Sequence, residues 1–378
     1  MKKSTLTYTQ KEIHLKSAKI EELESIRGLA ALLVVFYHIP KWNPVLDIGL
    51  VNNGYLMVHL FFVLSGFVIF NAYTEKINSK KDLFRFQFLR FGRLYPVHLL
   101  FLFVFLSIEI AKYIASSNFG IHSPNSIPFE RNNFSSFVKN IFLISSVLPH
   151  ELITYNDPSW SISVEFFTYL IFATCILLIK KNNLIFFTAL SFISLLMLVT
   201  ENTFGFEKML LCLAGFFIGC ITAKFTISIK KNISQFYSVV AILVIVSFLQ
   251  LKTTKDFDLL IYFLTAALIS TLVLSKNGIL KTILRLRFLT WLGMISYSVY
   301  MSHAAIIWFF NQFIRVVLKK PEVIQINEKT IPQLSQLEAF FAYVLVVSVI
   351  LIVSVFTYNF IEKPMREKSR RFAFSKLN

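Results

Sequence analysis

Arginine and histidine recur in this chain at positions where charge is otherwise rare, and these residue types can bind anions and move protons. Arg27 and His38 bracket ten uncharged residues in the segment SIRGLAALLVVFYHI, residues 25–39. If this segment is a helix, the two side chains lie on nearly the same face, roughly 16 Å apart along the axis. A guanidinium at one end can hold an anion. A neutral imidazole further along can act as a general base or as a nucleophile.

Three more titratable residues, His59, Glu165 and His303, fall within other apolar stretches. Counted from the expected helix ends, His38 lies roughly 18 Å from the inner membrane boundary, and the other three lie roughly 8 to 10 Å below the outer one. A lone histidine at such a depth is more often a hydrogen-bonded structural residue. Because ionisable groups inside a bilayer are expensive, four of them on four helices at related depths indicate a site.

A second set of cations is expected at the inner face of the membrane. It comprises Arg27, Lys80, Lys81, Arg85, Arg90, Arg93, Arg285 and Arg287. Charge that only sets topology is the alternative interpretation, above all for the lysines. Arg90 and Arg93 are better candidates, because their i, i+3 spacing puts both on one helix face and guanidinium suits bidentate phosphate binding. We therefore expect an anionic ligand that enters from the cytoplasm. Glu109 and Lys112, one turn apart, are expected to form an ion pair outside this site.

The composition places these residues in a membrane. The 378 residues are 56% hydrophobic with a mean hydropathy of +0.64, and several apolar runs can cross a bilayer of roughly 30 Å. A net charge of +17 would suggest nucleic acid for a soluble protein. In a membrane protein, the distribution of positive charge along the chain indicates topology and contact with membrane lipids. No nucleic acid partner is expected. The three cysteines lie in apolar runs, so we expect reduced core packing and no disulfide framework or metal site: Cys175, Cys212 and Cys220.

The apolar runs predict an all-α, polytopic bundle of about ten transmembrane helices. They are expected near residues 25–39, 54–73, 94–115, 159–179, 184–200, 208–226, 233–250, 258–275, 288–311 and 337–360. Phe137–Leu148 has about a dozen residues, which suits an interfacial or re-entrant segment better than a crossing. With the N-terminus inside, cytoplasmic segments hold 27 of the 38 Lys and Arg, so both termini are predicted to be cytoplasmic.

The same pattern divides the chain into three parts. We expect a cytoplasmic segment at 1–24, a transmembrane domain at 25–360 and a basic cytoplasmic tail at 361–378. The N-terminus is polar for too long to be a cleavable signal, so the first apolar run is expected to be retained. Pro96 and Pro158 are placed at helix starts, which predicts mostly continuous helices. No internal repeat is evident, which counts against repeat-built transporters. Gly215 and Gly219 are interpreted as a helix-packing pair.

Six segments of the chain form a series: IRGLAALLVVFYH, GYLMVHLFFVLSGFVI, FLRFGRLYPVH, PSWSISVEFFTYL, ISYSVYMSH and YNFIEKPMR. In this order they resemble sequence blocks of the acyltransferase family 3 membrane proteins, and the first resembles that family's Arg-x10-His signature. Together they cover the chain from Ile26 to Arg366. The family includes bacterial O-acetyltransferases of O-antigen and other surface glycans. The chain departs from it at His59, where many members carry an acidic residue, so the role of that carboxylate does not carry over.

The resemblance implies a multi-pass enzyme of the bacterial cytoplasmic (inner) membrane. Such an enzyme takes an acyl group, usually acetyl, from cytoplasmic acetyl-CoA and delivers it to a hydroxyl of a glycan or glycolipid on the outer side. Some relatives carry an extra C-terminal extracytoplasmic hydrolase-like domain. This chain ends with the basic tail FIEKPMREKSRRFAFSKLN, so a stand-alone enzyme without such a domain is expected.

The resemblance and the two tiers of charge together give a hypothesis for the site. The phosphates of the donor are expected to be held by four arginines, Arg27, Arg85, Arg90 and Arg93. The thioester then lies near His38, which acts as a general base or accepts the acyl group itself. Glu165 is expected to orient an imidazole or to bind the sugar. His303 is expected to assist the acceptor or to stabilise developing negative charge.

Three more residues are assigned to substrate binding: His59, Ser65 and Trp160. Ser65 and Gly66 form a small polar opening, although close packing accounts for them equally well. Trp160 is expected to stack on a sugar ring, and the aromatic belt of membrane proteins is the alternative. Two other functions stay open. A transporter of a glycolipid or anionic metabolite would use the same charges, and a non-catalytic partner of a glycan assembly complex would not need them.

Overall fold

The computed structural model of the chain describes residues 20–179, 183–229, 231–324 and 329–375. Its helices are α2 (Glu21–His38), α3 (Gly49–Asn52), α4 (Met57–Tyr73), α5 (Lys80–Phe119), α6 (Phe134–Ile141), α7 (Trp160–Leu178), α8 (Asn183–Val199), α9 (Glu207–Ser228), α10 (Phe236–Leu251), α11 (Leu260–Leu274), α12 (Ile279–Leu284), α13 (Arg287–Gln312), α14 (Gln336–Thr357) and α15 (Lys363–Ser375). Strands β1 (Glu322–Ile324) and β2 (Thr330–Pro332) form a small antiparallel ribbon. Short 3₁₀ turns lie at Pro44–Leu46, Gly54–Leu56 and Asp157–Ser159, and π-helical turns at Phe313–Val317 and Tyr358–Glu362.

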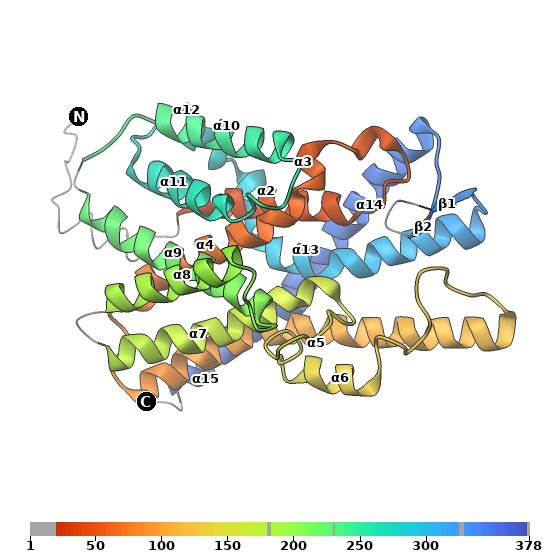
Figure 1. Cartoon of the computed structure of the whole chain (residues 1–378), viewed down its shortest axis with the longest axis horizontal. Coiled ribbons are helices and arrows are strands. Elements are labelled where there is room, and N and C mark those ends of the chain that lie inside the picture. Colours follow the sequence, from red (N-terminus) through yellow and green to blue (C-terminus); the bar gives the residue numbers. More distant parts are fainter. Residues whose placement is uncertain (1–19, 180–182, 230, 325–328, 376–378) are drawn as a thin grey trace.

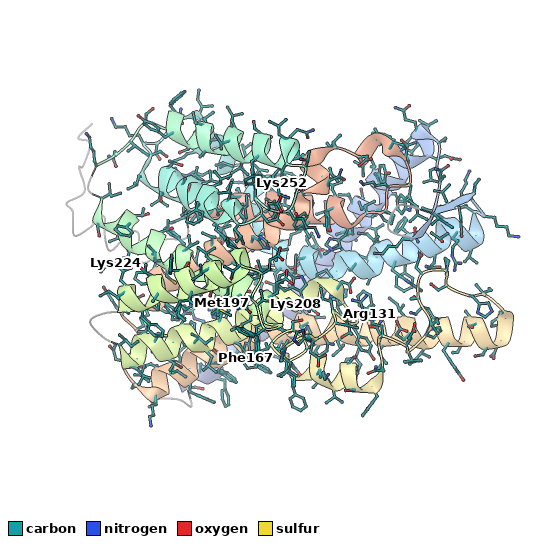
Figure 2. The ribbon with its side chains drawn as sticks, in the orientation of Figure 1. Arg131, Phe167, Met197, Lys208, Lys224 and Lys252 are labelled. Atoms are coloured by element: carbon teal, nitrogen blue, oxygen red, sulfur yellow. The ribbon has the colours of Figure 1, made fainter. Side chains whose placement is uncertain are left out.

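The fold is an all-α bundle of a multi-pass membrane protein, as predicted. Among the described residues, six helices are long and apolar enough to cross a membrane, and α8, α10 and α11 are shorter apolar helices. The two lysines of α9, Lys208 and Lys224, lie near its opposite ends with uncharged residues between them, as expected for a span (Figure 2). Every segment expected to be a helix overlaps one. The number of crossings, the cytoplasmic placement of both termini and the division into three parts stay predictions.

Helix α5 is longer than its apolar part predicts. It begins at Lys80, where the Ser79 side chain accepts a hydrogen bond from the backbone N–H of Asp82, and it continues for 40 residues along the bundle (Figure 1). Pro96 therefore lies inside this helix, and its predicted place at a helix start is wrong. The carbonyl that the Pro96 ring crowds belongs to Gly92, four residues earlier, whose backbone has the most freedom to adjust. Pro158 does lie immediately before α7.

Two helix pairs pack through glycine. In the α4 and α9 pair, a Cβ on Gly66 would lie 1.8 Å from the Phe216 carbonyl oxygen, and one on Gly219 would lie 2.1 Å from that of Val63. The two helices therefore approach until backbones touch, which confirms the packing interpretation of Gly219. In the α2 and α13 pair, a Cβ on Gly293 would lie 2.0 Å from a backbone oxygen of α2.

The connection between α5 and α7 is anchored by a buried ion pair. Glu109 and Lys112 lie 2.7 Å apart with 2% and 7% of their side chains exposed, which confirms the expected pair. Glu109 also accepts hydrogen bonds from the backbone N–H of Phe129 and from Asn132, at 3.0 and 2.7 Å. Burial, and after it the Glu109 charge, raises the pKa of Tyr155 to about 12, so its hydroxyl stays a donor to the connecting loop. Helix α6, within this connection, has eight residues and is too short to cross.

Candidate active site

A narrow chamber of about 90 Å³ lies between α2, α4, α5, α7 and α13. Four of the predicted site residues line it: Arg27, Ser65, Arg93 and Glu165. These residues come from four different helices, and two of them, Arg27 and Glu165, are far apart in the sequence. The fold therefore brings together a large part of the site that was predicted from charge and depth.

A hydrogen-bonded series crosses one wall of the chamber. The Tyr169 hydroxyl donates to Glu165 Oε1 at 2.6 Å, and it lies 2.8 Å from Ser65 Oγ. Because a tyrosine hydroxyl carries one hydrogen and that hydrogen goes to Glu165, Ser65 must be the donor to Tyr169. Ser65 thus has a polar role in the chamber wall, while its neighbour Gly66 provides close packing. Tyr169 was not singled out from the sequence.

A second and larger pocket, of about 710 Å³, lies toward the first half of α5 and is lined by Arg85, Arg90 and Arg93. Arg90 donates a hydrogen bond to the Tyr73 hydroxyl at 3.0 Å, and its guanidinium lies 5.2 Å from the centre of the Tyr73 ring. Three of the four arginines predicted to hold phosphate are therefore together. The fourth, Arg27, lines the chamber instead and pairs with Glu24 at 3.2 Å.

Arg93 lines both the basic pocket and the chamber. Its Nε is buried and has no hydrogen-bond partner among the described residues, and the same is true of the Nε of Arg90. Both guanidinium groups also line the basic pocket, and guanidinium is a preferred partner of phosphate and carboxylate, so an anionic ligand can bind there. The basic pocket and the chamber therefore meet at Arg93. The sequence alone did not show this shared boundary.

His38 and His303 form a pair beyond the chamber, with ring centroids 4.8 Å apart. In both rings Nδ1 faces the backbone carbonyl four residues earlier, Val34 at 2.9 Å and Val299 at 3.3 Å. A carbonyl only accepts hydrogen bonds, so Nδ1 carries the proton in each neutral ring and Nε2 keeps its lone pair. The Nε2 of His303 is buried and has no hydrogen-bond partner in the part of the chain that the structure describes. The arrangement offers two imidazole nitrogens able to accept a proton or an electrophile.

Tyr300 connects the two parts of the site. It lines the chamber, and its ring centre lies 5.9 Å from that of His303. Its hydroxyl donates to the carbonyl of Pro158 at 2.9 Å. Neither His38 nor His303 lines the chamber itself. The order in space is therefore basic pocket, Arg93, chamber, Tyr300 and then the histidine pair.

Two predicted residues lie apart from the histidine pair. His59 is buried against Tyr262, with ring centres 5.2 Å apart, and its Nδ1 has no partner among the described residues. Trp160 packs edge-on against Phe62 at 5.9 Å. Neither residue lines the chamber or the basic pocket. Their assignment to substrate binding stays a prediction.

Sequence reasoning missed a buried carboxylate close to the arginines of the chamber. Glu362 is 2% exposed and accepts a hydrogen bond from Ser298 Oγ at 2.7 Å. It lies within electrostatic reach of Arg93, Arg366 and Arg27. The depth argument that selected Glu165 would have found it if the last span had been extended through the π-helical turn at Tyr358–Glu362.

A family model and one of two relatives carry the name of an acyltransferase. A family model described as an acyltransferase domain matches residues 20–358. Acyltransferase MdmB from Streptomyces mycarofaciens is 30% identical over 172 residues, which are 43% of this chain and 41% of that protein. Protein 2 in the picA locus of Rhizobium radiobacter is 38% identical over 97 residues, which are 24% of this chain and 47% of that protein. The chain thus matches less than half the length of each of these relatives. No solved structure matches the chain.

Proposed function

The chain belongs to the acyltransferase family whose domain model matches residues 20–358, and we propose that it transfers an acetyl group from one side of a membrane to the other. The proposed donor is cytoplasmic acetyl-CoA, and the proposed acceptor is a hydroxyl of an extracytoplasmic glycan or glycolipid, such as O-antigen or exopolysaccharide. The proposed location is the bacterial cytoplasmic membrane.

The observation that carries the proposal is the position of Arg93. This guanidinium borders the basic pocket on one side and the chamber on the other. A donor whose phosphates pair with Arg90 and Arg93 would have its slender thiol arm directed into the chamber, toward Tyr300 and the histidine pair. A long donor with a charged end and a reactive end suits this arrangement of a cationic pocket followed by a narrow passage.

His38 is proposed to carry out the chemistry through Nε2. As a general base, Nε2 takes the proton of the acceptor hydroxyl while the hydroxyl oxygen bonds to the acyl carbon. The bond between that carbon and the thioester sulfur breaks, and the thiolate takes up the proton from His38. As a nucleophile, Nε2 would instead bond to the acyl carbon first and pass the acyl group to the acceptor in a second step. Both routes give the same products, an ester and free CoA.

The remaining predicted residues receive supporting roles in this proposal. His303 lies beside His38 and is placed to assist the acceptor or to stabilise negative charge on the acyl oxygen. Glu165, fixed by Tyr169 and through it by Ser65, is placed to hold the arm or the sugar within the chamber. Arg27, also in the chamber wall, is proposed to stabilise charge there and not to hold the phosphates outside it.

The test compares surface glycans from cells with and without the gene by mass spectrometry. The proposal expects one acyl group per modified sugar to disappear with the gene and to return with the intact gene but not with His38→Ala. The transporter alternative expects movement of substrate without covalent change. Proteoliposomes that hold the protein and receive acetyl-CoA separate the two, because only the enzyme releases free CoA. Unchanged acyl content together with no release of CoA would contradict the proposal.

A further inference from the structure

The segment after the last apolar helix is itself a helix, and it packs on the bundle. α14 passes through the π-helical turn Tyr358–Glu362 directly into α15, which lies along the first half of α5 (Figure 1). At the contact, a Cβ on Gly92 would lie 2.3 Å from the Cβ of Ser369. Ser369 and Ala373, one turn apart, are both buried here. The glycine on α5 and two small residues on α15 therefore permit a close approach of the two helices.

This contact sets the polar face of α15 opposite the arginines of α5. Arg366 and Arg370, four residues apart, lie on one face of α15, and both line the basic pocket with Arg90 and Arg93. Arg85 links the two helices, because its Nε donates to the Ala373 carbonyl at 3.2 Å. The pocket is thus a space between two helices, and each helix contributes guanidinium groups.

The pocket has more positive charge than its own residues neutralise. Its lining includes six cations and two carboxylates, namely Lys76, Arg85, Arg90, Arg93, Arg366 and Arg370 against Asp82 and Glu367. Within the described residues, Arg370 forms no hydrogen bond or ion pair, and the Nε atoms of Arg90 and Arg93 are buried without partners. Several guanidinium groups around one space, with an excess of positive charge, match a ligand with several phosphates.

Aromatic rings complete the wall. Tyr73, Phe86 and Phe374 line the same pocket, and the Phe374 ring lies 5.1 Å from the Arg85 guanidinium. Aromatic faces and guanidinium planes both stack on planar bases. A pocket that combines them with free phosphate-binding donors has the chemistry to hold a nucleotide.

We propose that α15 is the second wall of the donor site, and that Arg366 and Arg370 bind phosphate groups of a nucleotide-bearing acyl donor held against Arg90 and Arg93. The inference rests on the proposed function and deepens it, since it makes the nucleotide part of the donor a requirement. Thioesters that carry only the pantetheine arm lack the groups that this wall recognises. The segment expected to be a basic tail is then part of the substrate site.

The test measures binding of coenzyme A and of pantetheine, which lacks phosphates and nucleotide, to the full chain in lipid nanodiscs. Arg370→Gln should weaken coenzyme A binding about tenfold or more, the effect of losing a hydrogen bond to a charged group. It should leave the weak binding of pantetheine unchanged. Arg371→Gln is the matched control, because it removes the same charge from a position of α15 that does not line the pocket.

A second variant tests the position of α15 with every pocket cation kept. Gly92→Ala must push Ser369 away, so a folded Gly92→Ala protein should also lose affinity for coenzyme A. Equal effects of Arg370→Gln and Arg371→Gln, or an unchanged affinity in folded Gly92→Ala, would overturn the inference. Its failure differs from that of the proposed function. If Arg370→Gln leaves acyl transfer unaffected, only the role of α15 in the donor site is contradicted. If coenzyme A binding depends on Arg370 but no acyl transfer occurs, only the proposed function is contradicted.

Discussion

His38 on α2 and His303 on α13 lie with their ring centroids 4.8 Å apart, at the end of a parallel helix pair. Ten residues before each histidine, Gly28 meets Gly293, where a Cβ on Gly28 would lie 2.6 Å from the Gly293 backbone nitrogen. Ten residues advance each helix by about 15 Å, so the helices stay adjacent from the glycine contact to the histidines. The glycine contact therefore belongs to the same helix pair that holds the two imidazoles face to face.

Replacement of His38 should abolish acyl transfer without loss of the protein. His38→Ala removes the proposed base or nucleophile, and a rate loss of about 10²-fold or more is expected from such a group. The measurement is release of free CoA by purified protein, normalised to folded, inserted protein. His122→Ala is the control, because His122 lies in an exposed loop. Among the described residues, its side chain hydrogen-bonds to Ser116 and its backbone carbonyl accepts from Arg315. An active His38→Ala protein would remove His38 from the mechanism.

Replacement of Arg93 should raise the donor concentration needed for half-maximal rate. Arg93→Gln removes a charge shared by the basic pocket and the chamber, so the apparent KM for acetyl-CoA should rise about tenfold or more. Titration of acetyl-CoA in proteoliposomes measures the change. Lys80→Gln, an exposed cation at the start of the same helix, should leave KM unaltered. Equal KM values for both variants would show that the charge of Arg93 only sets the membrane topology of the chain.

Glu362 should act on the donor in the opposite direction. Its carboxylate lies within electrostatic reach of Arg93 and Arg366, so it competes with donor phosphate for the same cations. Glu362→Gln keeps an oxygen for the Ser298 hydrogen bond and removes the charge. Coenzyme A should then bind more tightly, by several-fold, while turnover falls because Arg93 loses a nearby opposite charge. Binding and kcat are measured separately, and weaker binding of coenzyme A would show that Glu362 only supports the fold.

The apolar sequence predicts most of the helices because burial in lipid requires long uncharged runs, and these can be read directly. Depth, which follows from residue count, assigns Arg27 and Arg93 to the inner tier and Glu165 to the outer half of the membrane, whereas the structure gathers all three around one chamber. Depth alone does not tell which face of a helix meets which neighbour. His59 shares the depth of Glu165 and His303 but faces Tyr262 on α11 instead, and only the packing of α4 against α9 and α11 decides that.

The sequence also predicts the ends of the helices poorly. Charged residues in the first half of α5, and Pro96 within it, resemble a boundary in the sequence. The helix nevertheless begins at the Ser79 cap and packs against α15 along this half. The basic residues of α15 resemble a solvated tail for the same reason. Their role in the pocket depends on Ser369 and Ala373, two small residues with little hydrophobic signal. Sequence patterns therefore predict the apolar helices well and the charged part of the bundle, between α5 and α15, poorly.

The separation of α2 and α13 gives the sharpest test of the histidine pair. In Gly293→Ala the new Cβ would lie 2.0 Å from the Glu24 carbonyl oxygen, so the helices must move apart at a cost of about 1 to 3 kcal/mol. Gly49→Ala is a matched control, because its Cβ would lie 2.0 Å from the Gln250 carbonyl oxygen, at the contact of α3 with α10 and away from the chamber. Both variants should lose thermal stability, measured as the midpoint of unfolding in detergent. Only Gly293→Ala should also lose kcat per folded molecule, because only this change separates His38 from His303. If kcat per folded molecule falls equally in both, the glycine contact supports the bundle in general and does not set the imidazole geometry.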